Sequence, residues 1–141
     1  MSQQDVELVR RLYEGERELA ALIQEGRDLG GHPWFELWHP ECVLEDLAEA
    51  PDRNTYSGRE GVARYFRDAY EEVWDWRFTP VEIAECGEGV LAVVDLAGLA
   101  KSGVEVTMRL YQVFRVRAGQ VAFATGFASR DEAVRTLEAQ G

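Results

Sequence analysis

Apolar residues in the first part of the chain recur at steps of three and four, which is the period of an amphipathic helix. Gly26 interrupts this pattern, and Ser2 precedes Asp5 by three residues in an imperfect capping arrangement. We therefore predict a helix that ends near Gly26. Its apolar face is formed by Leu8, Val9, Leu12, Tyr13, Leu19 and Ile23.

Three later segments also carry helix signals. Pro33 suits the first turn of a short helix, which stops before Pro40. Two capping boxes, in which a serine and a glutamate three residues later bond the first turn of a helix, predict two more helices. These boxes are Ser57 with Glu60 and Ser129 with Glu132.

The remaining apolar runs have strand character, with runs at residues 42–47, 76–85, 89–100, 104–117 and 120–128. The order is helix, helix, strand, helix, four strands, helix. It predicts an α+β fold in which a strongly bent antiparallel sheet carries helices over its concave face. Residues 1–141 are expected to form one domain.

Two hairpin turns decide which strand residues face inwards. Two-residue turns at Ser102-Gly103 and Ala118-Gly119 would fix how the last three strands pair. Every second residue of these strands would then lie on one shared, mostly apolar face. That face must be the inner one, and its polar members are Asp95, Gln112 and Thr125. The other face carries charged and aromatic residues that suit solvent or a subunit contact, namely Thr107, Arg109, Tyr111, Val113 and Arg115.

The net charge of −11 repels phosphate backbones and anionic lipid heads, so we expect neither nucleic acid nor membrane as a partner. The first residues lack the pattern of a signal peptide and no run is long enough to span a bilayer, which favours a cytoplasmic protein. Cys42 and Cys86 have no metal-type spacing and are predicted to be buried free thiols.

Two neighbouring acids, Glu45 and Asp46, end the first predicted strand, and alternation sends them to opposite faces. Parity alone leaves open which of them faces inwards. His32, Glu36 and His39 have a spacing that could gather metal ligands on one helical side, but the helix between Pro33 and Pro40 is too short to hold them. We expect no metal and no cofactor.

The segments "LWHPECVLED", "YSGREGVARYF" and "RVRAGQVAFATGFASRDEA" resemble the nuclear-transport-factor-2-like superfamily, within it the ketosteroid isomerase and SnoaL-like polyketide cyclase group. The resemblance covers nearly the whole chain. It implies a cone, in which a curved sheet surrounds an apolar pocket closed by helices, and a homodimer formed through the back of the sheet.

The resemblance also implies site residues. Asp46 takes the place of the aspartate that removes a proton next to a carbonyl, with Leu44 inside and Glu45 outside. Tyr13 matches the tyrosine that bonds the developing enolate, and Gln112 stands where a protonated aspartate is found. The inner-face alignment adds Asp95, with a raised pKa expected from burial. The expected pocket lining is Trp34, Trp38, Leu44, Phe66, Val93, Leu110, Phe114, Phe123, Thr125 and Phe127.

These residues predict a protein that binds a small apolar molecule. If it is an enzyme, it is a cofactor-free isomerase, cyclase or dehydratase with Asp46 as general base. The alternative is a ligand-binding or dimerisation module without catalysis, since fold does not fix function. Each site residue also has a structural interpretation: Asp46 as a turn or cap residue, Asp95 as an exposed residue, Gln112 and Thr125 as a bonded pair, and Tyr13 as a core aromatic.

Overall fold

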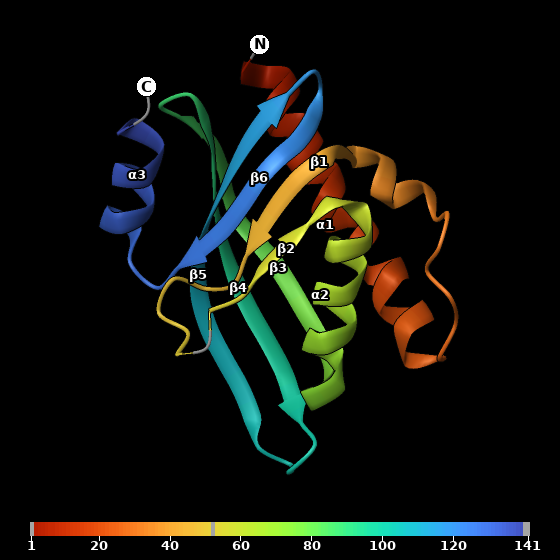
Figure 1. Ribbon diagram of the computed structural model, residues 1–141. Coiled ribbons are helices and arrows are strands. Elements are labelled where there is room, and N and C mark those ends of the chain that lie inside the picture. The colour runs from red at the N-terminus through yellow and green to blue at the C-terminus, as the bar shows by residue number, and fades with distance from the viewer. Residues whose placement is uncertain (1, 52, 140–141) are drawn as a thin grey trace.

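A computed structural model of the protein describes residues 2–51 and 53–139. In this part of the chain a six-stranded sheet has the strand order β2-β1-β6-β5-β4-β3 (Figure 1). Its helices are α1 (Ser2–Gln24), the short 3₁₀ helix η1 (Pro33–Leu37), α2 (Gly58–Glu72) and α3 (Arg130–Glu138). Its strands are β1 (Trp38–Glu45), β2 (Thr55–Ser57), β3 (Val73–Cys86), β4 (Gly89–Ala100), β5 (Glu105–Arg117) and β6 (Gln120–Phe127).

The predicted helices and the α+β class are confirmed. Gly26, just after α1, has a φ of 73°, a left-handed conformation that glycine adopts without strain. At α3 the predicted cap is present, since the side chain of Ser129 accepts a hydrogen bond from the Glu132 N–H. The sheet is largely antiparallel, but β1 runs parallel to β6.

The structure corrects the region around β1. The strand begins at Trp38 and passes through Pro40, whereas the sequence predicted a helix up to Pro40 and a strand from residue 42. The register between β1 and β6 shifts between Trp38 and Val43, and such an irregular stretch tolerates a proline, which has no N–H to donate. The short edge strand β2 was not predicted.

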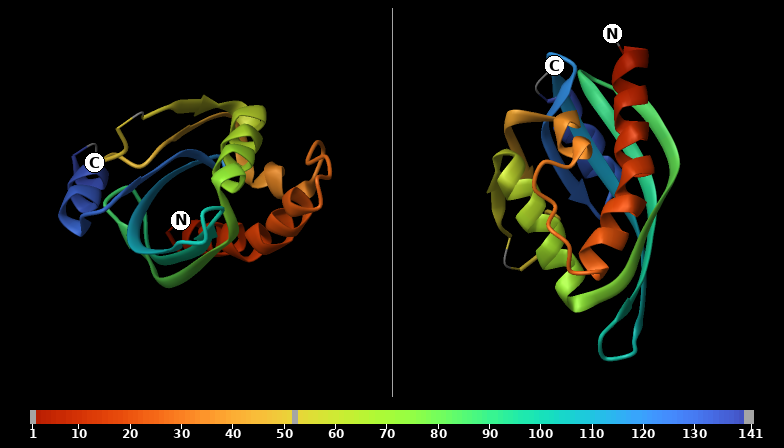
Figure 2. Two further views of the ribbon diagram at one scale, coloured as in Figure 1. Left: turned by 90° about the horizontal axis from the view of Figure 1, so that it is seen from below. Right: turned by 90° about the vertical axis from the view of Figure 1, so that its right-hand side faces the viewer.

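The helices lie on both sides of the sheet. The larger core contains apolar residues of α1, η1, α2 and the concave face of the sheet, including Val9, Val62 and Phe114. Figure 2 shows the sheet curving around α1 and α2, with α3 apart from them. A second, smaller core joins α3 to the reverse face of the sheet. The expectation that all helices cover the concave face is therefore wrong for α3.

The β4–β5 hairpin does not have the predicted two-residue turn. Leu99 pairs with Glu105 and Asp95 pairs with Arg109, so one more residue lies in the loop than we expected. Gly103 adopts a φ of 90°, as the last residue of a three-residue hairpin loop does. This single extra residue moves the side chains of β4 to the opposite face relative to β5.

The β5–β6 turn is as predicted, but the strands slip beyond it. Arg117 pairs with Gln120 across Ala118 and Gly119, which both have positive φ values of 55° and 77°. A bulge then shifts the register between Arg115 and Val116, so that Gln112 lies opposite Gly126 and not opposite Thr125. Gln112 keeps its predicted inner position. Val93, Asp95, Phe123 and Phe127 were assigned to the face of Gln112, but this register places them on the opposite face.

Helix α3 covers part of the reverse face. Leu137 and Ala133 of α3 pack on Val113 and Phe127 of the sheet, and all four are buried. An Arg115 nitrogen donates a hydrogen bond to the backbone oxygen of Thr136, over 2.9 Å. Val113 and Arg115, which the sequence suggested for a subunit contact, thus contact α3 of the same chain.

Candidate functional site

A cavity of about 60 Å³ lies between the concave face of the sheet and helices α1 and α2. Most of its wall is apolar or aromatic. The polar groups on the wall come from α1 and from the inner ends of the strands. The lining residues are Leu12, Glu16, Trp38, Leu44, Glu45, Leu47, Tyr65, Phe66, Phe78, Leu110, Gln112, Phe114, Ala124, Thr125 and Gly126.

Glu16 brings a carboxyl group into this apolar surrounding. It follows Leu12 by one helical turn, on the face of α1 that packs against the sheet. Its Oε2 atom is enclosed and has no hydrogen-bond partner among the described residues. Burial without a partner disfavours the charged form, and it raises the pKa of Glu16 to about 8. Glu16 is therefore mostly protonated at pH 7.

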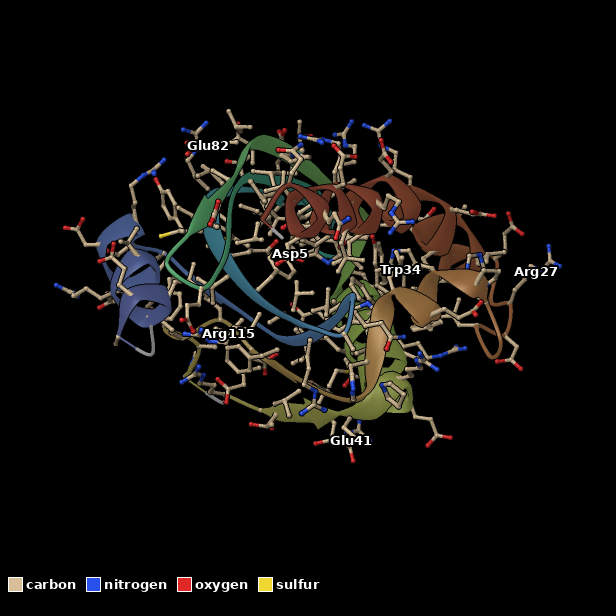
Figure 3. All side chains as sticks on the ribbon, turned by 90° about the horizontal axis from the view of Figure 1, so that it is seen from above. Asp5, Arg27, Trp34, Glu41, Glu82 and Arg115 are labelled. Atoms are coloured by element: carbon tan, nitrogen blue, oxygen red, sulfur yellow. The ribbon has the colours of Figure 1, made fainter. Side chains whose placement is uncertain are left out.

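Trp38 offers a second unpaired polar atom on the same wall. The residue is 3% exposed, and its indole Nε1 has no partner in the part of the chain that the structure describes. The neighbouring Trp34 differs, because its Nε1 donates a hydrogen bond of 2.9 Å to the Leu12 backbone oxygen. Figure 3 shows Trp34 between α1 and η1. Buried polar atoms in folded proteins are nearly always paired, so two unpaired atoms in one cavity mark it as a place for a ligand or water.

Tyr13 and Gln112 are brought together, as the resemblance implied. The Tyr13 hydroxyl donates a hydrogen bond to Gln112 Oε1, and Gln112 lines the cavity. Because Oε1 is occupied, the amide nitrogen of Gln112 is the group left to donate to a ligand. Burial, with a smaller effect from the nearby charges of Glu16 and Tyr65, raises the pKa of Tyr13 well above its ordinary value.

Tyr65 of α2 completes the polar part of the wall. Burial raises its pKa, and the negative charges of Asp46 and Glu16 raise it further. Tyr13, Glu16 and Tyr65 therefore all hold their protons strongly. The part of the cavity around Glu16 and Tyr65 disfavours negative charge.

The position of Asp46 differs from the one that the resemblance implied. The Asn54 N–H donates to Asp46 Oδ2 over 2.9 Å, and the Asp46 N–H donates to the Asn54 backbone oxygen over 3.0 Å. Asp46 thus closes the loop that follows β1, and it does not line the cavity. Glu45, expected outside, lines it and bonds Arg53 at 2.7 Å. The strand ends at Glu45, so alternation no longer governs the next side chain.

Asp95 lies outside the site. It pairs with Arg109 at 2.7 Å on the reverse face, and its side chain is 53% exposed. The hydrogen bond from Arg109 lowers the pKa of Asp95, which is the opposite of the expected shift. The cause is the extra residue in the β4–β5 loop.

The predicted lining is only partly found in the cavity. Six of the expected residues line it: Trp38, Leu44, Phe66, Leu110, Phe114 and Thr125. Trp34 packs against Phe35, Trp38 and Phe66 in the core behind the wall. Val93, Phe123 and Phe127 are absent from the lining, and Phe123 and Phe127 belong to the core under α3. The Thr125 hydroxyl donates to the Asp46 backbone oxygen and not to Gln112.

Glu16 is the residue that sequence reasoning missed. The signal was present, since Glu16 interrupts the apolar stripe four residues after Leu12 and three after Tyr13.

No group of three or more potential metal ligands occurs among the described residues. His32 instead caps η1 by accepting from the Trp34 N–H. In the same part of the chain both cysteines are free, Cys42 buried and Cys86 half-buried, and no helix is long and apolar enough to cross a membrane.

The curved sheet, the two helices over it and the cavity between them are those of an NTF2-like cone. Residues 9–124 match the model of the SnoaL-like domain, and the chain belongs to that family. An uncharacterised PhzA/B-like protein of Pseudomonas aeruginosa is 32% identical over 124 residues, which are 85% of this chain and 83% of that protein.

Solved structures are similar over nearly the whole chain. An NTF2-like protein of unknown function from Burkholderia pseudomallei has a TM-score of 0.72 at 21% identity, over 97% of this chain and 98% of that one. A candidate SnoaL-like polyketide cyclase from Jannaschia sp. CCS1 has a TM-score of 0.69 at 18% identity, over 99% and 94% of the two chains. At these identities the likeness shows the fold alone.

Proposed function

We propose that the protein binds a small, largely apolar molecule in the cavity, through one oxygen atom that accepts hydrogen bonds. The observation that carries this proposal is the pair of unpartnered polar atoms on one apolar wall, Glu16 Oε2 and Trp38 Nε1. An indole N–H donates only, so a ligand that satisfies Trp38 has to offer an acceptor. Protonated Glu16 is a second donor at neutral pH, and an unpaired buried donor favours a ligand that pairs with it.

A chemical step on such a ligand would be a cofactor-free acid–base reaction: isomerisation, cyclisation or dehydration. A pKa of about 8 suits Glu16 to give or take a proton near neutral pH. Glu16 replaces Asp46 in this role, because the Asp46 carboxylate bonds the Asn54 amide. The candidate cyclase from Jannaschia has the same fold, and its assignment agrees with this class of reaction.

A ligand-binding protein without catalysis is the second candidate. The hydrogen bond between the Asn54 N–H and the Asp46 carboxylate favours it. Because of this bond, Asp46 is not free to act beside Glu16 as a second acid or base. A reaction that moves a proton between two carbon atoms with Glu16 alone requires that this one group both removes and returns it.

The experiment uses cyclohexanone, an apolar ring with one acceptor oxygen, and follows the tryptophan indole N–H resonances by NMR. We expect the Trp38 resonance to shift on titration. The Trp34 resonance serves as the internal control, since its N–H is already bonded to Leu12. The Trp38→Phe variant assigns the signal, and it should bind about fivefold more weakly because it lacks one hydrogen bond.

The pH dependence of binding tests the role of Glu16. Only the protonated acid donates to a ketone, so the affinity should fall about tenfold between pH 7 and pH 9 for a pKa of about 8. Glu16→Gln still donates from its amide and should bind without this decline. If cyclohexanone leaves the Trp38 resonance in place, or if the wild type and Glu16→Gln have the same pH profile, the proposal fails.

A further inference from the structure

The cavity on the concave face is too small for most ligands of a binding protein. It measures about 60 Å³, whereas sites for drug-sized molecules span roughly 300–1,000 Å³. Beside it an open groove of about 470 Å³ runs between α1 and β3. The groove has charged residues as well as apolar ones. Its α1 side is formed by Arg10, Tyr13, Glu14 and Arg17, and its β3 side by Phe78, Pro80, Val81, Glu82 and Ile83.

Phe78 lines both the groove and the cavity, so the wall between them is one side chain thick at this point. Tyr13 crosses the same boundary. It lines the groove, while its hydroxyl donates a hydrogen bond to Gln112, which lines the cavity. The two spaces are thus neighbours separated by Phe78 and Tyr13. Tyr13 is held by its hydrogen bond, which leaves Phe78 as the part of the wall that can move.

The strand that carries Phe78 is suited to such a movement. β3 lies at one edge of the sheet, and β2 lies at the other. Its register with β4 shifts on both sides of Phe78, between residues 74 and 77 and between Pro80 and Glu82. Phe78 itself is only half-buried. An edge strand with two irregularities has fewer backbone bonds to hold its side chains in place than a central strand.

We propose that the ligand site has two parts divided by Phe78: the cavity takes the oxygen-bearing end of the ligand, and the groove takes an apolar extension of it. The inference rests on the proposed function of the cavity. It narrows the ligand to an elongated, mostly apolar molecule with an acceptor oxygen at one end. Val81, which is 55% exposed in the groove, then contacts the extension.

Two probes separate the two parts of the site. Cyclohexanone fills the cavity alone, and 4-phenylcyclohexanone adds a phenyl group that reaches past Phe78 into the groove. We expect the long probe to bind at least about tenfold more tightly, because its phenyl group is removed from water. Phe78→Ala should speed association of the long probe, since the dividing side chain is gone.

Val81→Glu is the decisive variant, and Val104→Glu is its matched control. Both valines are exposed, at 55% and 61%, but Val104 lies in the β4–β5 loop, away from the groove. A carboxylate in the groove should weaken the long probe at least about fivefold, while cyclohexanone binding stays within about twofold. Val104→Glu should change neither probe. Thermal melting confirms that both variants are folded.

The outcomes distinguish the two proposals. In the first outcome, cyclohexanone binds with the expected dependence on pH and Trp38, but the long probe binds no more tightly than cyclohexanone, or Val81→Glu leaves its affinity unchanged. The two-part site is then wrong and the cavity assignment stands. If cyclohexanone does not bind in the cavity at all, the proposed function fails and the bipartite site fails with it.

Discussion

Burial of Glu16 makes the stability of the folded protein depend on pH. Its pKa rises from 4.5 to about 8 on folding, so above pH 4.5 the unfolded chain loses a proton that the native state keeps. The contribution of Glu16 to the free energy of unfolding therefore decreases as the pH rises from 4.5 to about 8, and it is constant above that pH. Glu16→Gln removes the dependence. Its advantage over the wild type should grow by at most about 1.4 kcal/mol per pH unit between pH 5 and pH 8.

Denaturant unfolding at pH 5, 7 and 9 measures this advantage. Glu14→Gln is a suitable control, because Glu14 is an exposed acid on the same helix. An advantage of Glu16→Gln that is the same at all three pH values would mean that the carboxyl group is solvated.

Asp46 is expected to stabilise the loop after β1. Asp46→Asn keeps an oxygen that accepts the Asn54 N–H, so its unfolding free energy should stay within about 0.5 kcal/mol of the wild type. Asp46→Ala leaves that N–H without its partner and should lose about 0.5–2 kcal/mol. Thermal melting compares the two variants. The opposite result would be an Asp46→Ala variant as stable as the wild type, together with loss of cyclohexanone binding in Asp46→Asn. It would show that Asp46 belongs to the ligand site.

At the scale of elements, α3 forms a unit separate from the cavity. Leu137 is fully buried between α3 and the reverse face. Leu137→Ala should destabilise the protein by about 2–4 kcal/mol through the cavity that it leaves. Cyclohexanone affinity in the folded variant should stay within about twofold, because the sheet separates the two cores.

Val134→Ala on the same helix is the control for this substitution, and it should lose less because Val134 is half-buried. A large loss of ligand affinity in Leu137→Ala would contradict the separation of the two cores.

The sequence predicted the elements better than their faces. Local signals decide where helices begin and end, so the Ser129 cap and the break at Gly26 were readable from a few neighbouring residues. Facing depends on register, which one residue reverses. The three-residue loop that ends at Gly103 and the bulge near Val116 each added such a residue. They moved Asp95 to the reverse face and separated Thr125 from Gln112, its predicted partner.

The candidate site was also predicted only in part. The resemblance implied that Tyr13 and Gln112 lie together, and their side chains are hydrogen-bonded to each other. Asp46 lies one residue beyond the end of β1, where strand alternation stops. Glu16 could be identified as a site residue only from the structure, in which it lines the cavity and its buried Oε2 atom has no partner among the described residues.

At the scale of the whole molecule, we propose a homodimer through the part of the reverse face that α3 leaves open. This part includes Asp95, Leu99, Thr107 and Arg109, all exposed. Exposed apolar and arginine side chains on one face are typical of interfaces. Sedimentation at about 10 μM should give twice the mass of one chain.

Leu99→Glu tests this surface, since a buried unpaired charge opposes association. It should yield monomers, while Val104→Glu at the hairpin loop should not. A wild-type protein that sediments as a monomer would contradict the dimer.

The titration of the Glu16 carboxyl carbon by NMR tests the central claim most directly, with Glu16→Gln to assign the signal. The account predicts a pKa of about 8 in the free protein. Saturation with cyclohexanone should raise it further, because a ketone oxygen accepts from the acid and repels the carboxylate. A pKa near 4.5 that cyclohexanone leaves unchanged would show that Glu16 is solvated, and it would contradict the assignment of the cavity as the ligand site.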